Sequence, residues 1–142
     1  MREILFRGKR IDSGEWVCGS FCMDAREQFN GLCGVDGFIR LYDKDKGKMQ
    51  MHEVERESIG QFTGLTDKNG KKIFEGDIGK YKQTDGAKRN GKPIICIGKV
   101  IYNAKTASFA IESKDKAACK YFDYFQIKDF EVIGNIHDNP EL

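Results

Sequence analysis

The fold is decided by residues 59–78, which read IGQFTGLTDKNGKKIFEGDI. This stretch holds four of the sixteen glycines and places short apolar pairs on either side of an Asp-Lys-Asn-Gly turn. An Asn-Gly pair supplies the positive φ values that a tight hairpin or bulged turn requires. A Gly-Asp corner follows it and carries the chain into a further strand. We expect the stretch to be the hinge between two parts of the chain, with structural turn residues at Asp67, Asn69, Gly70, Gly76 and Asp77.

The composition indicates a β protein of one ordinary domain or two small lobes. The 142 residues include 16 glycines but only 2 prolines, and 39% are hydrophobic. Glycine-rich punctuation between short apolar runs is typical of strands joined by tight turns. The 24 basic and 22 acidic side chains leave a net charge of +2, which gives no global electrostatic reason to bind nucleic acid.

The same composition predicts a cytoplasmic protein. No apolar run approaches the roughly 20 residues needed to span a bilayer. The first ten residues carry charge where a signal peptide needs an apolar stretch. The five cysteines include no CxxC pair, so we expect free thiols in a reducing compartment.

Alternation of apolar and polar residues predicts a series of short strands. We expect these strands at residues 2–7, 15–23, 38–42, 49–54, 72–74, 78–83, 93–102, 108–112 and 130–133. The small residue at Gly19 permits another backbone or a large side chain to approach closely. Residues 114–125 carry apolar side chains at helical spacing, which favours a short helix, although 121–125 alone would also suit a strand. The fold class is therefore mainly β, with an N-terminal β-hairpin lobe at 1–56 packed with an SH3-like small barrel or roll at 57–142.

A family resemblance covers almost the whole chain. Its motifs are REILFRGKR at 2–10, GEWV at 14–17, GS at 19–20, IGQFTGL at 59–65, DKNGK at 67–71, IFEGDI at 73–78, VIGNI at 132–136 and NPEL at 139–142. In order and spacing they resemble the YopX-like family of phage and prophage proteins. The resemblance implies a β-rich fold with an SH3-type roll in the second half, and it brings no activity, ligand or catalytic residue. The segments 80–92 and 113–128 match no family pattern.

Residues 86–92, GAKRNGK, satisfy the GxxxxGK start of a phosphate-binding loop. That motif needs a Ser or Thr next, to hold Mg²⁺, and a helix whose N-terminal amides cradle phosphate. Pro93 and a β run follow instead. We interpret the segment as a solvated hairpin loop and expect no nucleotide cofactor.

A zinc site could in principle draw on Cys18, Cys22, Cys33 and His52. Four residues along a strand span roughly 13 Å, whereas two ligands of one zinc lie within about 4 Å of each other. Cys18 and Cys22 therefore cannot share a metal, and we expect none.

Glu75 and Asp77 straddle Gly76, and paired carboxylates can perform acid–base chemistry when they share a cleft. At a glycine corner, however, an Asp more often accepts backbone N–H bonds and fixes the turn. No Ser or Cys nucleophile is visibly poised beside His52 or His137. We expect no catalytic residue, and an enzyme using the two carboxylates stays an alternative.

The functional prediction is a non-enzymatic accessory protein that binds a protein partner or a second copy of itself, because a complete β scaffold carries no reactive cluster. Exposed strand edges would favour assembly through the edges of sheets. The alternative is nucleic-acid binding by the basic loop 80–92, since cations mixed with an aromatic can follow a phosphate backbone. The residues of that loop that would make contact are Lys80, Tyr81, Lys82, Lys88, Arg89 and Lys92.

Overall fold

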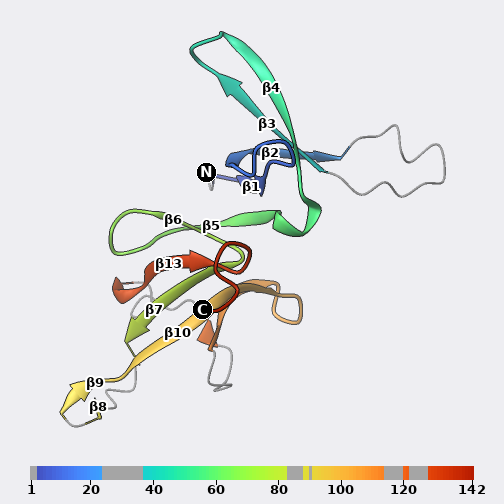
Figure 1. The fold of residues 1–142 in the computed structure, drawn as a ribbon. Helices are drawn as coiled ribbons and strands as arrows, with labels where there is room; N and C mark the ends of the chain where they lie inside the picture. Colours follow the sequence, from blue (N-terminus) through green and yellow to red (C-terminus); the bar gives the residue numbers. More distant parts are fainter. Residues whose placement is uncertain (1–2, 24–36, 83–87, 90, 114–119, 122–127) are drawn as a thin grey trace. The chain divides into compact units, whose positions relative to one another are not determined.

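The chain is mainly β, as expected, and divides into two compact units, Met1–Phe62 and Thr63–Leu142. The computed structural model in Figure 1 describes residues 3–23, 37–82, 88–89, 91–113, 120–121 and 128–142. The boundary expected after residue 56 falls ahead of the observed division. No helix in the described part of the chain has the length and apolar character to cross a bilayer.

The first unit is an antiparallel sheet of consecutive strands. Its spatial order is β4-β3-β2-β1, and β1 also pairs with the beginning of β5. A short 3-10 helix, η2, leads from β4 to β5. The bounds are β1 Phe6–Lys9, β2 Trp16–Met23, β3 Gly37–Asp43, β4 Lys48–Val54, η2 Arg56–Ser58 and β5 Gly60–Thr66. The strand expected at 2–7 thus begins later, at Phe6, and β5 runs through the stretch that we expected to be a hinge.

The sheet of the first unit curls until its end strands meet. Arg10, just after β1, forms an isolated antiparallel bridge with Val54 at the end of β4. Ile39 and Val54 are both fully buried. A Cβ added at Gly19 would lie 2.3 Å from the carbonyl oxygen of Arg40. The expected close backbone approach at Gly19 is therefore confirmed.

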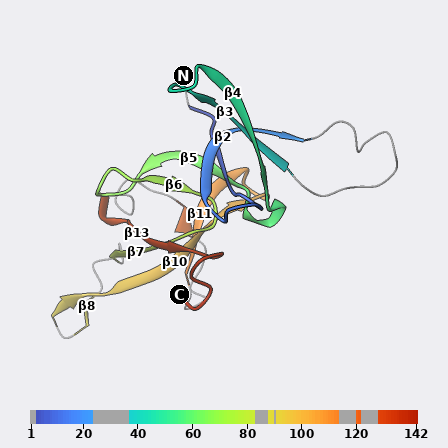
Figure 2. The same ribbon diagram turned by 45° about the horizontal axis from the view of Figure 1, so that its top comes forward.

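Strands β3 and β4 extend beyond the rest of this sheet as a two-stranded arm. The β2–β3 pairing stops at Ser20 opposite Arg40, whereas β3 and β4 stay paired to Asp43 opposite Lys48. Figures 1 and 2 show the two strands continuing side by side past β2. The arm is thus supported by one cross-strand ladder.

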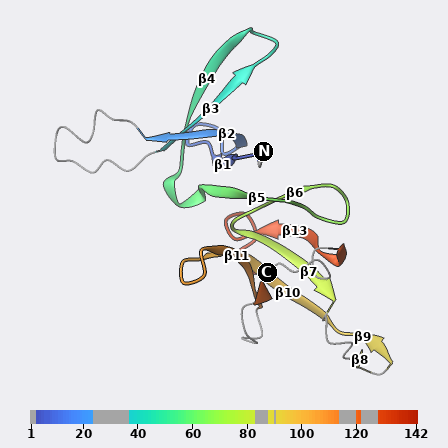
Figure 3. The ribbon, with the colours of Figure 1, turned by 180° about the vertical axis from the view of Figure 1, so that it is seen from behind.

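The second unit holds a five-stranded antiparallel sheet of order β12-β11-β10-β7-β13. Strand β6 neighbours β5, and β8 and β9 form a separate small hairpin beyond β7 and β10 (Figure 3). The bounds are β6 Lys72–Phe74, β7 Asp77–Lys82, β8 Lys88–Arg89, β9 Lys92–Pro93, β10 Ile95–Asn103, β11 Ser108–Ser113, β12 Lys120–Tyr121 and β13 Glu131–Asn135. This arrangement fits the expected SH3-like roll.

The helix favoured for residues 114–125 is not formed at Lys120 and Tyr121. These two residues form β12 and pair with β11, so at Tyr121 the strand alternative holds. A strand of two residues is defined by its backbone pairing with a neighbouring strand, so apolar side chains at helical spacing do not exclude it. The rest of the 114–125 expectation lies outside the described residues.

The core of the second unit gathers side chains from four strands and the residue before β13. Its fully or nearly buried members are Ile73, Tyr81, Val100, Ile111 and Phe130. The rings of Tyr81 and Phe130 stack with centroids 6.4 Å apart. Burying such side chains contributes about 1.5–3 kcal/mol each, so this cluster holds the sheet together.

Candidate functional site

Asp67 joins the turn of residues 67–70 to a strand far along the chain. Its Oδ1 atom accepts bonds from the N–H groups of Asn69 at 2.8 Å and Lys71 at 2.9 Å. Its Oδ2 atom accepts a bond from the N–H of Val132 in β13 at 3.0 Å. Burial alone would raise the pKa of Asp67, but the three backbone N–H donors outweigh it and lower the pKa. The carboxylate is thus fully engaged in holding the fold.

The remaining turn residues also serve the main chain. Gly70 and Gly76 have φ values of 80° and 83°, whereas Asn69 does not enter the positive region. Asp77 is 1% exposed, and its Oδ2 accepts a bond from the N–H of Phe74 at 2.7 Å. The geometry therefore gives Asp77 the turn-fixing role that such a corner favours.

Strand alternation separates the residues expected to bind nucleic acid. Tyr81 is 3% exposed and belongs to the core. Lys80 and Lys82 lie on the opposite face, where Lys80 pairs with Glu131 at 3.2 Å and Lys82 with Asp129 at 3.3 Å. Tyr81 is therefore no stacking platform for a base, and the two lysines already face carboxylates.

Glu131 receives a second cation from the 67–70 turn. Lys68 makes an ion pair with the same carboxylate oxygen that Lys80 contacts. Hydrogen bonds from Lys68 and Lys80 lower the pKa of Glu131. This face is thus a mixed-charge surface rather than a basic stripe.

The remaining cations of the basic loop lie at the β8–β9 hairpin. Arg89 is paired with Lys92 and Lys88 with Pro93 along its two-rung ladder. Lys92 is exposed, while the side chains of Lys88 and Arg89 lie outside what the structure describes. The sequence-predicted contact residues therefore belong to a buried core, an ion-paired face and a hairpin.

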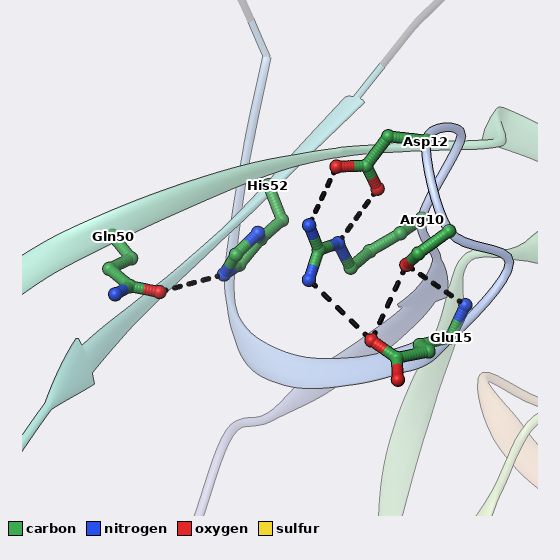
Figure 4. A network of polar contacts seen from close by, with 6 residues as sticks. Arg10, Asp12, Glu15, Gln50 and His52 are labelled. Carbon is green, nitrogen blue, oxygen red and sulfur yellow. Dashed lines mark hydrogen bonds and ion pairs between the residues drawn. The ribbon is translucent and has the colours of Figure 1, made fainter.

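A polar network in the first unit holds the turn after β1 (Figure 4). Arg10 donates through Nε and Nη2 to the two carboxylate oxygens of Asp12 at 2.9 and 2.6 Å, and its Nη1 lies 3.7 Å from Glu15. The guanidinium bond lowers the pKa of Asp12. His52 contacts Gln50 through Nε2 at 3.1 Å. Because Asp12 stays ionised and paired with Arg10, this contact stabilises the turn after β1.

The cysteines and acidic groups form no metal centre in the described part of the chain. No three His, Cys, Asp or Glu side chains gather there at ligand distances. Cys18, Cys22 and Cys96 form no disulfide in the described part of the chain, and Cys18 is exposed. Cys33 lies outside the described residues.

Among the residues that the structure describes, three exposed apolar side chains lie together on the β3–β4 arm. We call this surface the outer hairpin face and define it as Arg40 and Tyr42 on β3 with Met49 and Met51 on β4. Arg40 lies directly opposite Met51, and Tyr42 directly opposite Met49, so all four side chains share one side of the sheet. Tyr42, Met49 and Met51 are 57%, 50% and 58% exposed. Tyr, Met and Arg are the residue types enriched at protein interfaces, where Lys and Glu are depleted.

The same side of the sheet continues onto β2 and β1. Ser20 lies opposite Arg40, and alternation places Cys18 and Trp16 on that side as well. The guanidinium of Arg7 lies 4.8 Å from the centre of the Trp16 ring. Cation–π stacking of this kind keeps a large aromatic at the surface without a hydrophobic cover. The outer hairpin face therefore borders further residues of interface type.

The two exposed isoleucines of β10 are arranged differently. Ile95 and Ile97 are 57% and 36% exposed. Each lies directly opposite a lysine of β7, Lys82 and Lys80 respectively. Lysine stems commonly run along apolar surface. Because a lysine lies beside each of these isoleucines, we interpret this face as solvated.

Sequence reasoning did not identify the outer hairpin face as a site. Alternation along the expected strand at 49–54 places Met49 and Met51 on one side. The missing step was the register of the hairpin formed by the 38–42 and 49–54 strands, which brings Tyr42 and Arg40 beside the methionines. Hairpin register was therefore the available signal.

These features define the class: a mainly β protein of two antiparallel sheets, in which buried carboxylates fix turns and a projecting hairpin carries three of the exposed apolar side chains. The family model of the YopX protein matches residues 19–142, so the chain belongs to the YopX family. The crystal structure of protein EF1440 from Enterococcus faecalis is similar to it, with a TM-score of 0.53 and 24% identity over 99% of this chain and 98% of that chain. That likeness concerns the fold alone. No curated protein matches the sequence.

Proposed function

We propose that this protein is a non-enzymatic binding module that takes a protein partner on the outer hairpin face. The observation that carries the proposal is the exposure of Tyr42, Met49 and Met51 at 57%, 50% and 58% on adjacent strands. Contiguous exposed apolar side chains on a folded domain mark interaction sites more often than scattered ones do. The resemblance to phage and prophage proteins extends the proposal to an accessory role inside a bacterial cell.

The chemistry of the face favours a protein over a nucleic acid. Its single cation is Arg40, whereas a phosphate backbone is bound by several Lys and Arg side chains. Flexible methionines adapt to apolar partner surfaces and contact aromatic rings favourably. Tyr and Arg supply the large, partly polar anchors that dominate binding energies.

Site-specific photocrosslinking tests the proposal. A photoreactive benzoylphenylalanine would replace Tyr42 in one variant and Tyr102 in a matched control, in cells that carry the gene. The two tyrosines are comparably exposed, at 57% and 47%, but belong to different units. We expect a defined protein adduct at Tyr42, which Arg40→Glu diminishes. Equal adducts at both positions, or none at Tyr42, would refute the proposed surface.

A further inference from the structure

The outer edge of β4 carries unused main-chain donors and acceptors. At the end of the strand, the C=O of Glu53 accepts a bond from Ile11 at 3.2 Å, and the N–H of Glu55 donates to Lys9 at 2.9 Å. Val54 bridges Arg10 on one edge of β4 and pairs with Gly37 of β3 on the other edge. Lys9 and Ile11, which flank Arg10, therefore lie along the edge of β4 that faces away from β3. Odd-numbered residues of β4 therefore direct their N–H and C=O groups to the outer edge.

The uninterrupted register extends this rule along the arm. Pairing of β3 with β4 runs without a bulge from Gly37 opposite Val54 to Asp43 opposite Lys48. Backbone groups alternate between the two edges of a strand. Met49 and Met51 thus point their N–H and C=O groups outward, and no strand in the described part of the chain pairs with them.

The residues along this edge do not protect it. Natural edge strands are usually blunted by Lys, Pro, a bulge or an inward charge. Between Lys48 and Glu53 the sequence is Met-Gln-Met-His, with no Pro, Lys, Arg, Asp or Glu. Such an edge is a template for an added strand.

Resting on the proposed function, we infer that the outer hairpin face is extended by a second copy of the chain, joined at the outer edge of β4 by antiparallel pairing of two β4 strands about a two-fold axis. In this register Met49 of one copy lies opposite Met51 of the other, and Gln50 lies opposite itself. The two Met pairs exchange four N–H···O=C bonds and use all the outward groups of Met49 and Met51.

One neighbouring register is poorer. If Met51 lay opposite itself, Met49 would face Glu53, whose C=O already accepts the bond from Ile11. The preferred register also aligns the side chains. On the outer hairpin face, the two rows that contain Met49 then read Tyr42, Met49, Met51 of the second copy and Arg40 of the second copy, so no two like charges lie opposite each other in these rows. The outer hairpin faces of both copies merge into one surface.

Sedimentation velocity across a dilution series tests the pairing with two variants of one residue. Met51→Pro deletes an N–H on the outer edge and leaves the bonds to β3, which come from even-numbered residues. Met51→Ile keeps the N–H. We expect Met51→Pro to weaken dimerisation by about tenfold to a hundredfold, since it removes two of four interchain bonds, and Met51→Ile to change it by less than about threefold. Equal weakening by both variants, or a wild-type chain that is monomeric at every concentration, would overturn the inference.

Disulfide trapping tests the register and stays informative if Met51→Pro fails to fold. Directly opposite residues that are not hydrogen-bonded have Cα atoms about 4.5 Å apart, within reach of a disulfide. Under mild oxidation, Gln50→Cys should form a dimer linked through position 50, identified by mass spectrometry. The matched control His52→Cys should not link to itself, because in this register it faces Lys48. Self-linkage at 52 but not at 50 would refute the register. A monomeric chain that still yields a Tyr42 adduct with another protein would overturn the inference and leave the proposed function standing.

Discussion

Replacing Asp67 by Asn should destabilise the second unit by about 3 kcal/mol, mainly through one bond that the amide cannot make. Asp67 is 5% exposed and accepts three backbone N–H bonds. An Asn can keep its oxygen toward the N–H groups of Asn69 and Lys71. Two hydrogen bonds to a charged acceptor then become two neutral hydrogen bonds, each contributing about 1 kcal/mol. The NH₂ group of the Asn then faces the N–H of Val132, a half-buried donor that is left unsatisfied at a cost of about 1–3 kcal/mol. Relief from burying a charge offsets part of this sum.

Urea denaturation followed by far-UV circular dichroism measures the effect, and amide exchange of Val132 locates it. The matched control is Asp43→Asn. Asp43 also accepts two N–H bonds from its own loop, at 3.0 and 3.1 Å, but its third donor is the side chain of Gln50. A side-chain amide can turn its oxygen toward the new NH₂ group, whereas a strand N–H cannot. We therefore expect Asp43→Asn to cost less than about 1 kcal/mol. Equal losses in the two variants would refute the assignment of the cost to Val132.

Acid should erase the difference between wild type and Asp67→Asn. Because the folded chain lowers the pKa of Asp67 from 3.8, the stability it contributes is complete above that value. That contribution is lost as the pH falls through the lower, folded-state pKa. The gap between the two unfolding free energies should therefore narrow below about pH 4. A gap that stays constant down to pH 2.5 would show that the carboxylate charge is not the cause.

Three further outcomes follow from single contacts. Gly79→Ala would place a Cβ 2.1 Å from the ring of Phe130, so we expect a loss of about 2–4 kcal/mol in urea denaturation; a loss below about 0.5 kcal/mol would show that the ring moves freely. Asp77→Ala leaves the buried N–H of Phe74 without its 2.7 Å acceptor, and we expect it to cost about 1–3 kcal/mol by the same assay, with an unchanged midpoint counting against the contact. Cys18 is exposed and should be alkylated by a maleimide before the other described cysteines, as peptide mass spectrometry would show; slower labelling there would contradict its exposure.

The sequence predicted the strands well because turn chemistry and alternation are local. Asn-Gly and Gly-Asp marked corners at 67–70 and 75–77, and apolar alternation located most ladders to within a few residues. Strand β5 was missed because Gly and Thr at 60, 63 and 64 conceal its pattern. Its backbone bonds, rather than its side chains, define it.

The sites were harder to predict because they depend on distant partners. Asp67 was expected to fix its own turn, but its bond to Val132 spans 65 residues. Tyr81 was grouped with its basic neighbours, although the predicted strand at 78–83 already implied that it faces away from Lys80 and Lys82. Applying alternation within the segment would have removed Tyr81 from the contact set. The ion partners of the lysines, Glu131 and Asp129, could not be found without the fold.

The residues that fix the fold and the residues proposed to bind are of opposite kinds. Asp67 and Asp77 are polar and buried, while Met49 and Met51 are apolar and exposed. Exposed side chains away from special backbone sites typically change stability by less than about 0.5 kcal/mol, so folding alone does not require methionine at those two positions. An apolar, uncharged edge is also an aggregation hazard unless something covers it. Pairing of two such edges removes the hazard and uses the outward backbone groups, which connects the composition of the arm to its proposed role. Variants of Asp67 should accordingly change the free energy of unfolding, and variants of Met51 the dissociation constant.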